Sequence, residues 1–100
     1  MAITPVAGSV SQVTTGGTAV TAANANPNGG FITNPYSAAD QGLGSAEVLY
    51  INPVSTAGLA GNGTTFAIQP GGTWTIIAGQ TTPTSVNAAS SGHKFSVVVW

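Results

Sequence analysis

The fold class of this chain is indicated first by residues 66–76, which read FAIQPGGTWTI. Apolar residues alternate with Thr, Ala or Gln on both sides of the Pro-Gly-Gly turn, and such alternation is typical of a half-buried β-strand. Two strands joined by a short glycine-containing turn predict a β-hairpin. The chain is therefore expected to be built from β-strands here.

The same pattern extends outward in both directions. Runs rich in Val, Ile, Thr and aromatic residues recur between clusters of Gly, Pro, Asn and Ser, and they predict strands over 9–14, 19–22, 30–33, 47–52, 64–69, 73–78, 85–88 and 94–100. Helix-forming residues are scarce and fourteen glycines interrupt the chain, so only one short helical turn is expected, near 37–41. The prediction is all-β: a single β-sandwich or jelly-roll-like domain of about seven to eight short antiparallel strands.

The last predicted strand is apolar on both faces. Phe95, Val97 and Val99 share one face because successive side chains of a strand alternate, and Val98 and Trp100 share the other. Such a strand lies in the middle of a sandwich or is covered by a neighbouring subunit. The position of Trp100 at the end of the sequence favours the second arrangement.

The length of 100 residues fits one domain with a modest core. Residues 30–100 are expected to form the β-sandwich core. Residues 1–29 are harder to interpret, and they are expected to form an extended arm or edge strands of the same domain.

The charge content excludes several functions. Only 3% of the residues are charged, the net charge is −1 and cysteine is absent. A single Lys cannot neutralise many phosphates, so no nucleic-acid partner is expected. No apolar run is long enough to span a bilayer, so no membrane partner is expected. The first residues lack the basic start of a signal peptide, and we therefore expect the chain to be made in the host cytoplasm. A surface so close to neutral favours association with other proteins.

The few chemically active side chains give weak site hypotheses. Ser90 or Ser91 with His93 and Asp40 has the residue types of a catalytic triad. Asp40, Glu47 and His93 could contribute metal ligands, and the two acids could form a glycosidase pair. None of these sets has a diagnostic spacing, and a turn before the last strand explains the serines and His93 equally simply. We expect no enzyme, no catalytic residue, no cofactor and no metal.

The aromatic residues are the stronger candidates for binding, since aromatic side chains carry much of the energy of protein interfaces. We predict a protein interface that contains Phe31, Tyr36 and Trp100. Trp74, between threonines in a strand, is expected to pack in the core. A different class of function remains open: a carbohydrate-binding or adhesive β-module that uses Trp74 or Tyr36 as a platform for a glycan.

Three segments, residues 47–54, 61–74 and 86–99, together resemble small virion proteins of tailed bacteriophages, of the capsid decoration (cement) or head-fibre type. The resemblance implies a β-sandwich that binds the outer surface of the phage head and bridges major capsid proteins. It also implies a homo-oligomer, a trimer or a dimer, located in the virion.

Overall fold

The structure is a computed structural model that describes residues 4–25 and 27–100. These residues form ten strands and one short helix: β1 (Val6–Ala7), β2 (Gln12–Val13), β3 (Val20–Ala23), β4 (Gly30–Thr33), α1 (Ala38–Gln41), β5 (Leu49–Asn52), β6 (Phe66–Ile68), β7 (Thr73–Ile76), β8 (Thr84–Asn87), β9 (His93–Lys94) and β10 (Ser96–Val99). All of their pairings are antiparallel. The all-β prediction is confirmed.

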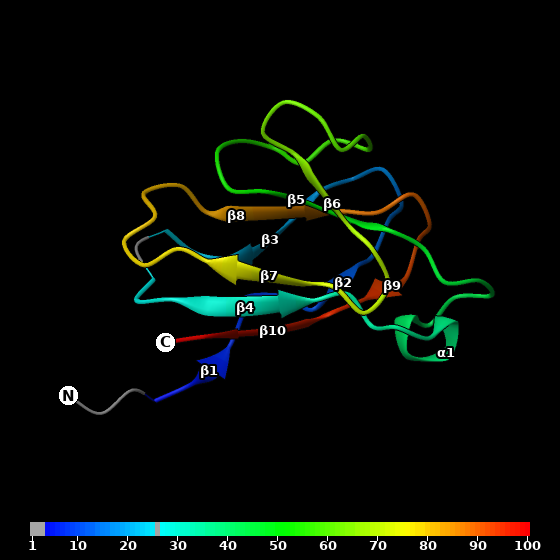
Figure 1. Ribbon diagram of the computed structural model, residues 1–100, viewed down its shortest axis with the longest axis horizontal. Helices are drawn as coiled ribbons and strands as arrows, with labels where there is room; N and C mark the ends of the chain where they lie inside the picture. Colours follow the sequence, from blue (N-terminus) through cyan, green and yellow to red (C-terminus); the bar gives the residue numbers. More distant parts are fainter. Residues whose placement is uncertain (1–3, 26) are drawn as a thin grey trace.

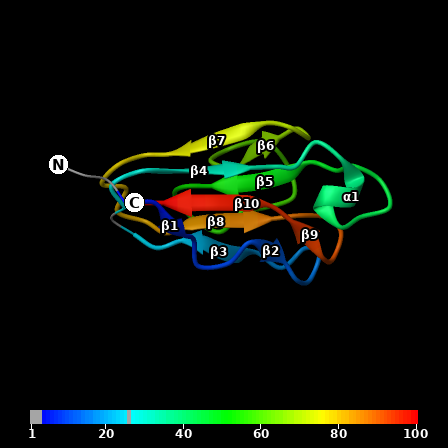
Figure 2. The ribbon, with the colours of Figure 1, turned by 90° about the horizontal axis from the view of Figure 1, so that it is seen from below.

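The strands form two four-stranded sheets and one two-stranded sheet. Sheet I has the order β1-β10-β4-β7, sheet II has the order β3-β8-β5-β6, and β2 pairs with β9 between them. The longer strands run along the long axis of the molecule (Figure 1), and α1 lies at the end opposite the last residue, as the perpendicular view in Figure 2 also shows. The described part of the chain is a β-sandwich.

The pairing follows one rule along the whole chain. Counting inward from the two ends, β1 pairs with β10, β2 with β9, β3 with β8, β4 with β7 and β5 with β6. The chain is thus one long hairpin, with its tip in the loop between β5 and β6. Rolling this hairpin up adds the pairings of β10 with β4 and of β8 with β5. The result is the strand order of a jelly roll.

The hairpin predicted from residues 66–76 is wrong. β6 pairs with β5 in sheet II, whereas β7 pairs with β4 in sheet I, so the chain crosses between the sheets at residues 69–72. The Pro-Gly-Gly turn itself forms, but Gly71 N donates to Asn34 O (2.7 Å) and Asn34 N donates to Gly72 O (3.0 Å). The crossing segment is therefore held by the chain after β4. Alternation of residues identifies strands without specifying their partners.

The N-terminal segment supplies edge strands. β1 is an edge of sheet I and β3 is an edge of sheet II, so residues 6–23 take part in both sheets of the sandwich. β1 lies outside the predicted strands, and the last predicted strand is divided into β9 and β10 at Phe95. Residues 1–3, which belong to the predicted arm, are outside the described part.

The helical turn predicted near 37–41 is confirmed as α1. The Ser37 side chain accepts a hydrogen bond from Asp40 N (3.1 Å), which caps the start of the helix. Gly42 ends the helix in the left-handed conformation, with φ of 75°.

The core lies between the two sheets. Its largest aliphatic members are fully buried and come from both sheets: Ile32, Leu49, Ile51, Ile76 and Val86. Val97 and Val99 of β10 pack against this core. Trp74 is partly buried against it as well, and its ring lies 4.8 Å from the ring of Phe66, centroid to centroid.

Candidate interaction surface

The outer face of sheet I carries an uncharged row of side chains across all four of its strands. The register places Ala7 opposite Val98, Val98 opposite Phe31 and Phe31 opposite Thr75. Side chains directly opposite each other share one face of a sheet, and Ile32 on the other face of β4 is fully buried. We call this row, with Trp100, the bare face. Phe31 is 43% exposed although it lies in an interior strand of the sheet.

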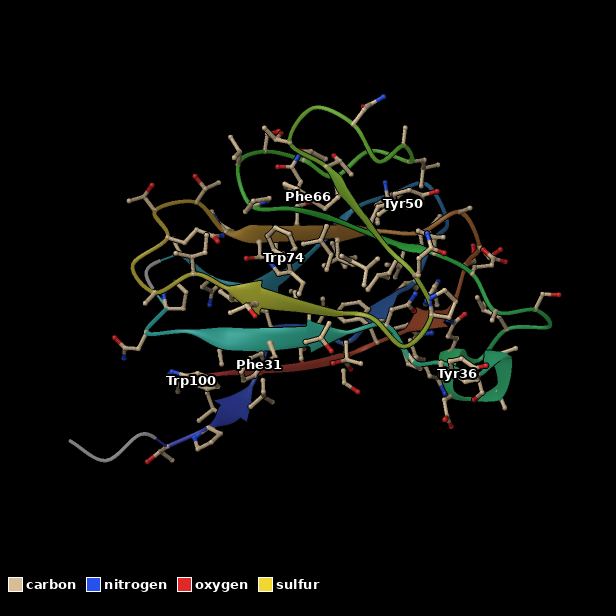
Figure 3. The ribbon with its side chains drawn as sticks, viewed as in Figure 1. Phe31, Tyr36, Tyr50, Phe66, Trp74 and Trp100 are labelled. Carbon is tan, nitrogen blue, oxygen red and sulfur yellow. The ribbon has the colours of Figure 1, made fainter. Side chains whose placement is uncertain are left out.

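Trp100 extends this row beyond the end of β10. Its ring centroid lies 5.3 Å from that of Phe31 at an interplanar angle of 62°, an edge-to-face contact (Figure 3). Its backbone continues the ladder: Trp100 N donates to Gly29 O (3.1 Å), and Asn28 N donates to Trp100 O (2.7 Å). A Cβ on Gly29 would lie 2.9 Å from Trp100 Nε1, so the absence of a side chain leaves room for the ring.

The outer face of sheet II is different because the chain covers part of it. Its register aligns Thr21, Ser85 and Asn52 in a polar row. The loop between β5 and β6 folds over this row: Ala57 N donates to Ser85 Oγ (2.9 Å), and Asn87 Nδ2 donates to Ala57 O (3.0 Å). Ala57 is consequently buried. One outer face is polar and partly covered, whereas the bare face has no such cover among the described residues.

Asn52 fixes the covering loop. Its Oδ1 accepts hydrogen bonds from the backbone N of Val54 and of Ser55, both at 2.8 Å. Its Nδ2 lies within hydrogen-bond distance of Thr64 Oγ1 (2.9 Å) and Thr65 Oγ1 (3.1 Å). A single buried amide thereby ties both ends of the loop to β5.

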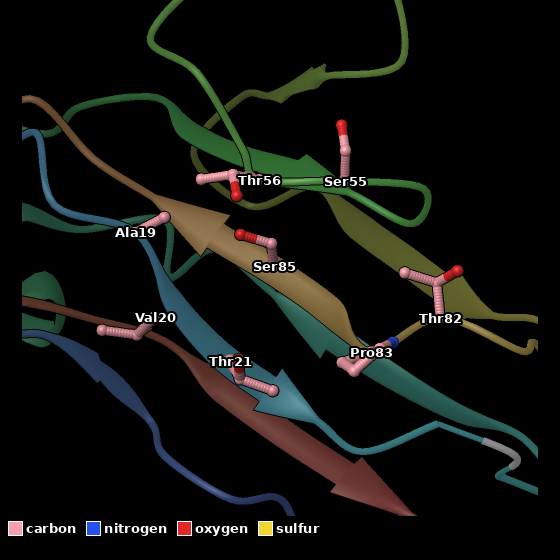
Figure 4. A pocket seen from close by; sticks show the side chains of 8 residues that line it. All are labelled: Ala19, Val20, Thr21, Ser55, Thr56, Thr82, Pro83 and Ser85. Carbon is pink, nitrogen blue, oxygen red and sulfur yellow. The ribbon is translucent and has the colours of Figure 1, made fainter.

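A hollow of about 300 Å³ opens beside this loop (Figure 4). Its walls are small or hydroxyl-bearing residues from three parts of the chain: Ala19, Val20, Thr21, Ser55, Thr56, Thr82, Pro83 and Ser85. Binding pockets for small molecules are usually lined mainly by apolar and aromatic side chains. This hollow offers hydroxyl groups but no aromatic platform.

The structure separates the three residues predicted to form an interface. Phe31 and Trp100 lie together on the bare face, whereas Tyr36 lies beside α1, away from both (Figure 3). Tyr36 is 80% exposed, and its ring edge is 3.3 Å from the position of a Cβ on Gly71.

A buried polar cluster lies at the α1 end of the molecule. Asn34, Gln41 and His93 are all fully buried. Asn34 Nδ2 donates to Glu47 O and to Ile68 O, each at 2.9 Å. Asn34 Oδ1 accepts hydrogen bonds from Gln41 Nε2 (3.1 Å) and His93 Nε2 (2.8 Å). The sequence reasoning missed Asn34 and Gln41, and the only signal was that both fall between the strands predicted over 30–33 and 47–52.

This cluster assigns the tautomer of His93. Asn34 Oδ1 can only accept, so His93 Nε2 carries the hydrogen and Nδ1 is left as an acceptor. Nδ1 is buried and has no partner among the described residues. Burial lowers the pKa of His93 below its ordinary value, and the nearby Glu47 carboxylate opposes this with a smaller raising effect.

The two serines near His93 bond elsewhere. Ser90 Oγ donates to Glu47 Oε2 (2.6 Å), and Ser91 Oγ accepts from Gly16 N (2.9 Å). His93 Nε2 is directed at Asn34. The residue types of a triad are therefore present, but the hydrogen bonds do not connect them as a triad requires. Within residues 4–25 and 27–100, no three His, Asp or Glu side chains gather as they would around a metal ion.

The described residues contain no helix with the length and apolar character needed to cross a bilayer. Comparisons with known proteins gave no match to a protein-family model, to a curated protein or to a solved structure.

Proposed function

We propose that this chain is a non-enzymatic structural subunit of a bacteriophage virion, a capsid decoration (cement) protein that binds the outer surface of the head and bridges major capsid proteins. The observation that carries the proposal is the bare face, with Phe31 and Trp100 at its centre and edge. The resemblance of residues 47–54, 61–74 and 86–99 to phage virion proteins supplies the biological setting.

The physical case rests on what the apolar side chains of this outer face, Phe31, Val98 and Trp100, do in water. Burial of apolar surface contributes about 25 cal/mol per Å², so a partner that covers this face gains affinity without ion pairs. A partner that binds the assembled shell stabilises it by mass action. Many copies on a symmetric lattice multiply a modest contact. A protein with 3% charged residues fits such a contact because few of its side chains carry a charge that would have to be desolvated in the interface.

Self-association belongs to the same proposal. In a symmetric dimer the same patch occurs on both partners, and residues near the axis meet their own copies. A charged side chain there would be repelled, whereas Phe31, Val98 and Thr75 carry no charge. The bare face is therefore suited to contact a second copy as well as a capsid subunit, and the proposed oligomer is a dimer or a trimer.

Glycan binding is the less favoured alternative. Sugars stack on exposed aromatic rings, and the rings of Phe31 and Trp100 meet edge to face at 62° instead of forming a coplanar platform. The hollow beside the β5–β6 loop has no aromatic wall. Tyr36 is exposed, but it lies apart from both features.

The test is quantitative mass spectrometry of purified particles of the phage whose genome encodes this chain. A copy number close to that of the major capsid protein supports a decoration protein distributed over the whole shell. A far smaller copy number indicates a vertex, fibre or tail component, which contradicts the decoration role. Absence from the particles overturns the virion proposal, and binding of the purified chain to a glycan array would then favour the alternative.

A further inference from the structure

We propose that Asn62 is a site of spontaneous deamidation in the folded protein, and that the fold protects Asn28 from the same reaction. Both asparagines are followed by glycine, in the pairs Asn28-Gly29 and Asn62-Gly63. Glycine offers the least steric hindrance to attack by its own backbone nitrogen. The sequence alone therefore gives both sites the same reactivity, and any difference must come from the structure.

The reaction needs only water as a co-reactant. The backbone nitrogen of the glycine attacks Cγ of the asparagine, a bond forms between them, and the bond from Cγ to Nδ2 breaks. The amide hydrogen of the glycine leaves with the side-chain NH2 as ammonia, and a cyclic imide remains. Water then opens the imide at either carbonyl, which yields aspartate or isoaspartate.

Asn62 has the freedom that ring closure requires. Asn62 and Gly63 are both exposed, in the loop at the tip of the rolled hairpin, between β5 and β6. A Cβ on Gly63 would meet no atom within 4 Å, and the backbone hydrogen bonds of Asn62, from its N to Ala60 O (2.9 Å) and to its O from Thr65 N (3.0 Å), stay within the loop itself. No hydrogen bond of the described residues involves the Asn62 side chain.

Asn28 is held in the opposite way. Gly29 is buried, and the Trp100 ring lies 2.9 Å from the position of a Cβ on it. Hydrogen bonds to Trp100 lie on both sides of the reacting peptide: Asn28 N donates to Trp100 O, and Gly29 O accepts from Trp100 N. The attack on Asn28 Cγ therefore needs prior local opening of the end of β10. A tenfold slower reaction corresponds to an opening free energy of only about 1.4 kcal/mol.

The product changes the hairpin tip in two ways. Each event adds a carboxylate to a chain whose only acidic side chains are Asp40 and Glu47. Isoaspartate also inserts a methylene group into the backbone, in the turn where Thr65 N donates to Asn62 O (3.0 Å). Thr65 Oγ1 also accepts a hydrogen bond from Asn52 Nδ2, the amide that fixes the loop. A change of the backbone at Asn62 that moves Thr65 would therefore disturb this hydrogen bond.

The experiment ages the folded chain in mildly alkaline buffer and follows isoaspartate by enzymatic methylation and peptide mass spectrometry. Chymotrypsin cleaves after Phe and Leu, so residues 60–66 report on Asn62 and residues 1–31 report on Asn28. We expect the first peptide to become acidic at least about ten times faster than the second. In urea, where the fold is lost, the two rates should converge, mainly because the Asn28 site accelerates.

The matched variant is Asn62→Gln, which disfavours the five-membered ring but keeps an amide. It should remove most of the isoaspartate formed by the folded chain. Equal rates at the two sites in the folded chain would overturn the proposal. Persistence of the amide at Asn62 in the folded chain while it reacts in urea would overturn it as well, since the tip loop would then be protective.

Discussion

Asn34 is the residue on which three separate parts of the chain meet. Its amide joins β4 to Glu47 before β5, to Ile68 at the end of β6, and to His93 in β9. Because Asn34 is fully buried, water cannot take the place of a protein partner that is lost. The polar cluster therefore specifies where the chain crosses between the sheets.

Replacement Asn34→Ala is expected to lower the free energy of unfolding by about 2 kcal/mol or more. The substitution takes a hydrogen-bond partner from Ile68 O and from His93 Nε2, whereas Gln41 Nε2 keeps its bonds to Pro35 O and Glu47 O, and each buried group left unsatisfied costs about 1–3 kcal/mol. Urea unfolding measures the effect. The control is Asn24→Ala at an exposed position, which should stay within about 0.5 kcal/mol of the wild type. Similar losses in both variants would contradict this role for Asn34.

His93 makes the stability depend on pH. The unfolded chain takes up the imidazole proton at its ordinary pKa of 6.5, whereas burial lowers the pKa in the folded state. Below about pH 6.5 the unfolded state binds more protons than the folded state. The free energy of unfolding is therefore greatest above about pH 6.5, and it decreases by at most about 1.4 kcal/mol per pH unit as the pH falls toward the folded pKa.

Urea unfolding at about pH 7.5 and about pH 5.5 tests this dependence. The variant His93→Gln keeps an amide that can donate to Asn34 Oδ1 but removes the titrating group, so its stability should change less between the two pH values. An equal change in the variant and in the wild type would assign the dependence to other groups.

Among the elements, the crossings between the sheets leave little room for added atoms. Gly8 follows β1, where the chain leaves sheet I, and the next residue, Ser9, donates from its N to Ala22 O of β3 (2.8 Å). A Cβ on Gly8 would lie 2.6 Å from Ala22 O and 2.7 Å from both γ-methyl carbons of Val97. The backbone carbonyl of Ala22 belongs to β3, so it cannot yield without moving that strand.

The substitution Gly8→Ala should therefore destabilise the protein by about 1–3 kcal/mol. For a domain of this size that corresponds to a decrease in Tm of at least about 4 °C, measurable by circular dichroism during heating. Gly44→Ala is the matched control because a Cβ there would meet nothing within 4 Å. A Tm for Gly8→Ala equal to that of this control would show that β1 and β3 can separate at little cost.

The elements also show what the sequence could predict. Alternation placed β4 correctly and β5 to β8 to within a few residues, and it put Val98 and Trp100 on one face, because these features depend on local periodicity. Strand pairing depends on contacts far apart in the chain, so the turn at residues 70–72 was mistaken for a hairpin. The burial of Asn34 was missed for the same reason. Polar residues in a loop sequence give no sign of burial when their partners lie in β6 and β9.

At the scale of the whole molecule, the two outer faces differ in how far the chain itself covers them. The loop between β5 and β6 covers part of the polar face of sheet II, and Ala57 is buried beneath it. The bare face of sheet I keeps Phe31 43% exposed. A carboxylate buried without a partner costs several kcal/mol. The same substitution should therefore have different effects on the two faces if only the bare face forms a contact.

We expect Phe31→Asp to abolish self-association and Thr21→Asp, an exposed position on the outer face of sheet II, to leave it unchanged. In a symmetric contact each Phe31→Asp subunit would place a carboxylate against the face of its partner, so the cost applies twice per dimer. Sedimentation velocity measures the species present, and urea unfolding confirms that both variants fold. A monomeric wild type would contradict the self-association part of the proposal while leaving capsid binding to be tested on particles. Dissociation by Thr21→Asp alone would transfer the contact to sheet II, where the covering loop would itself have to be part of the interface.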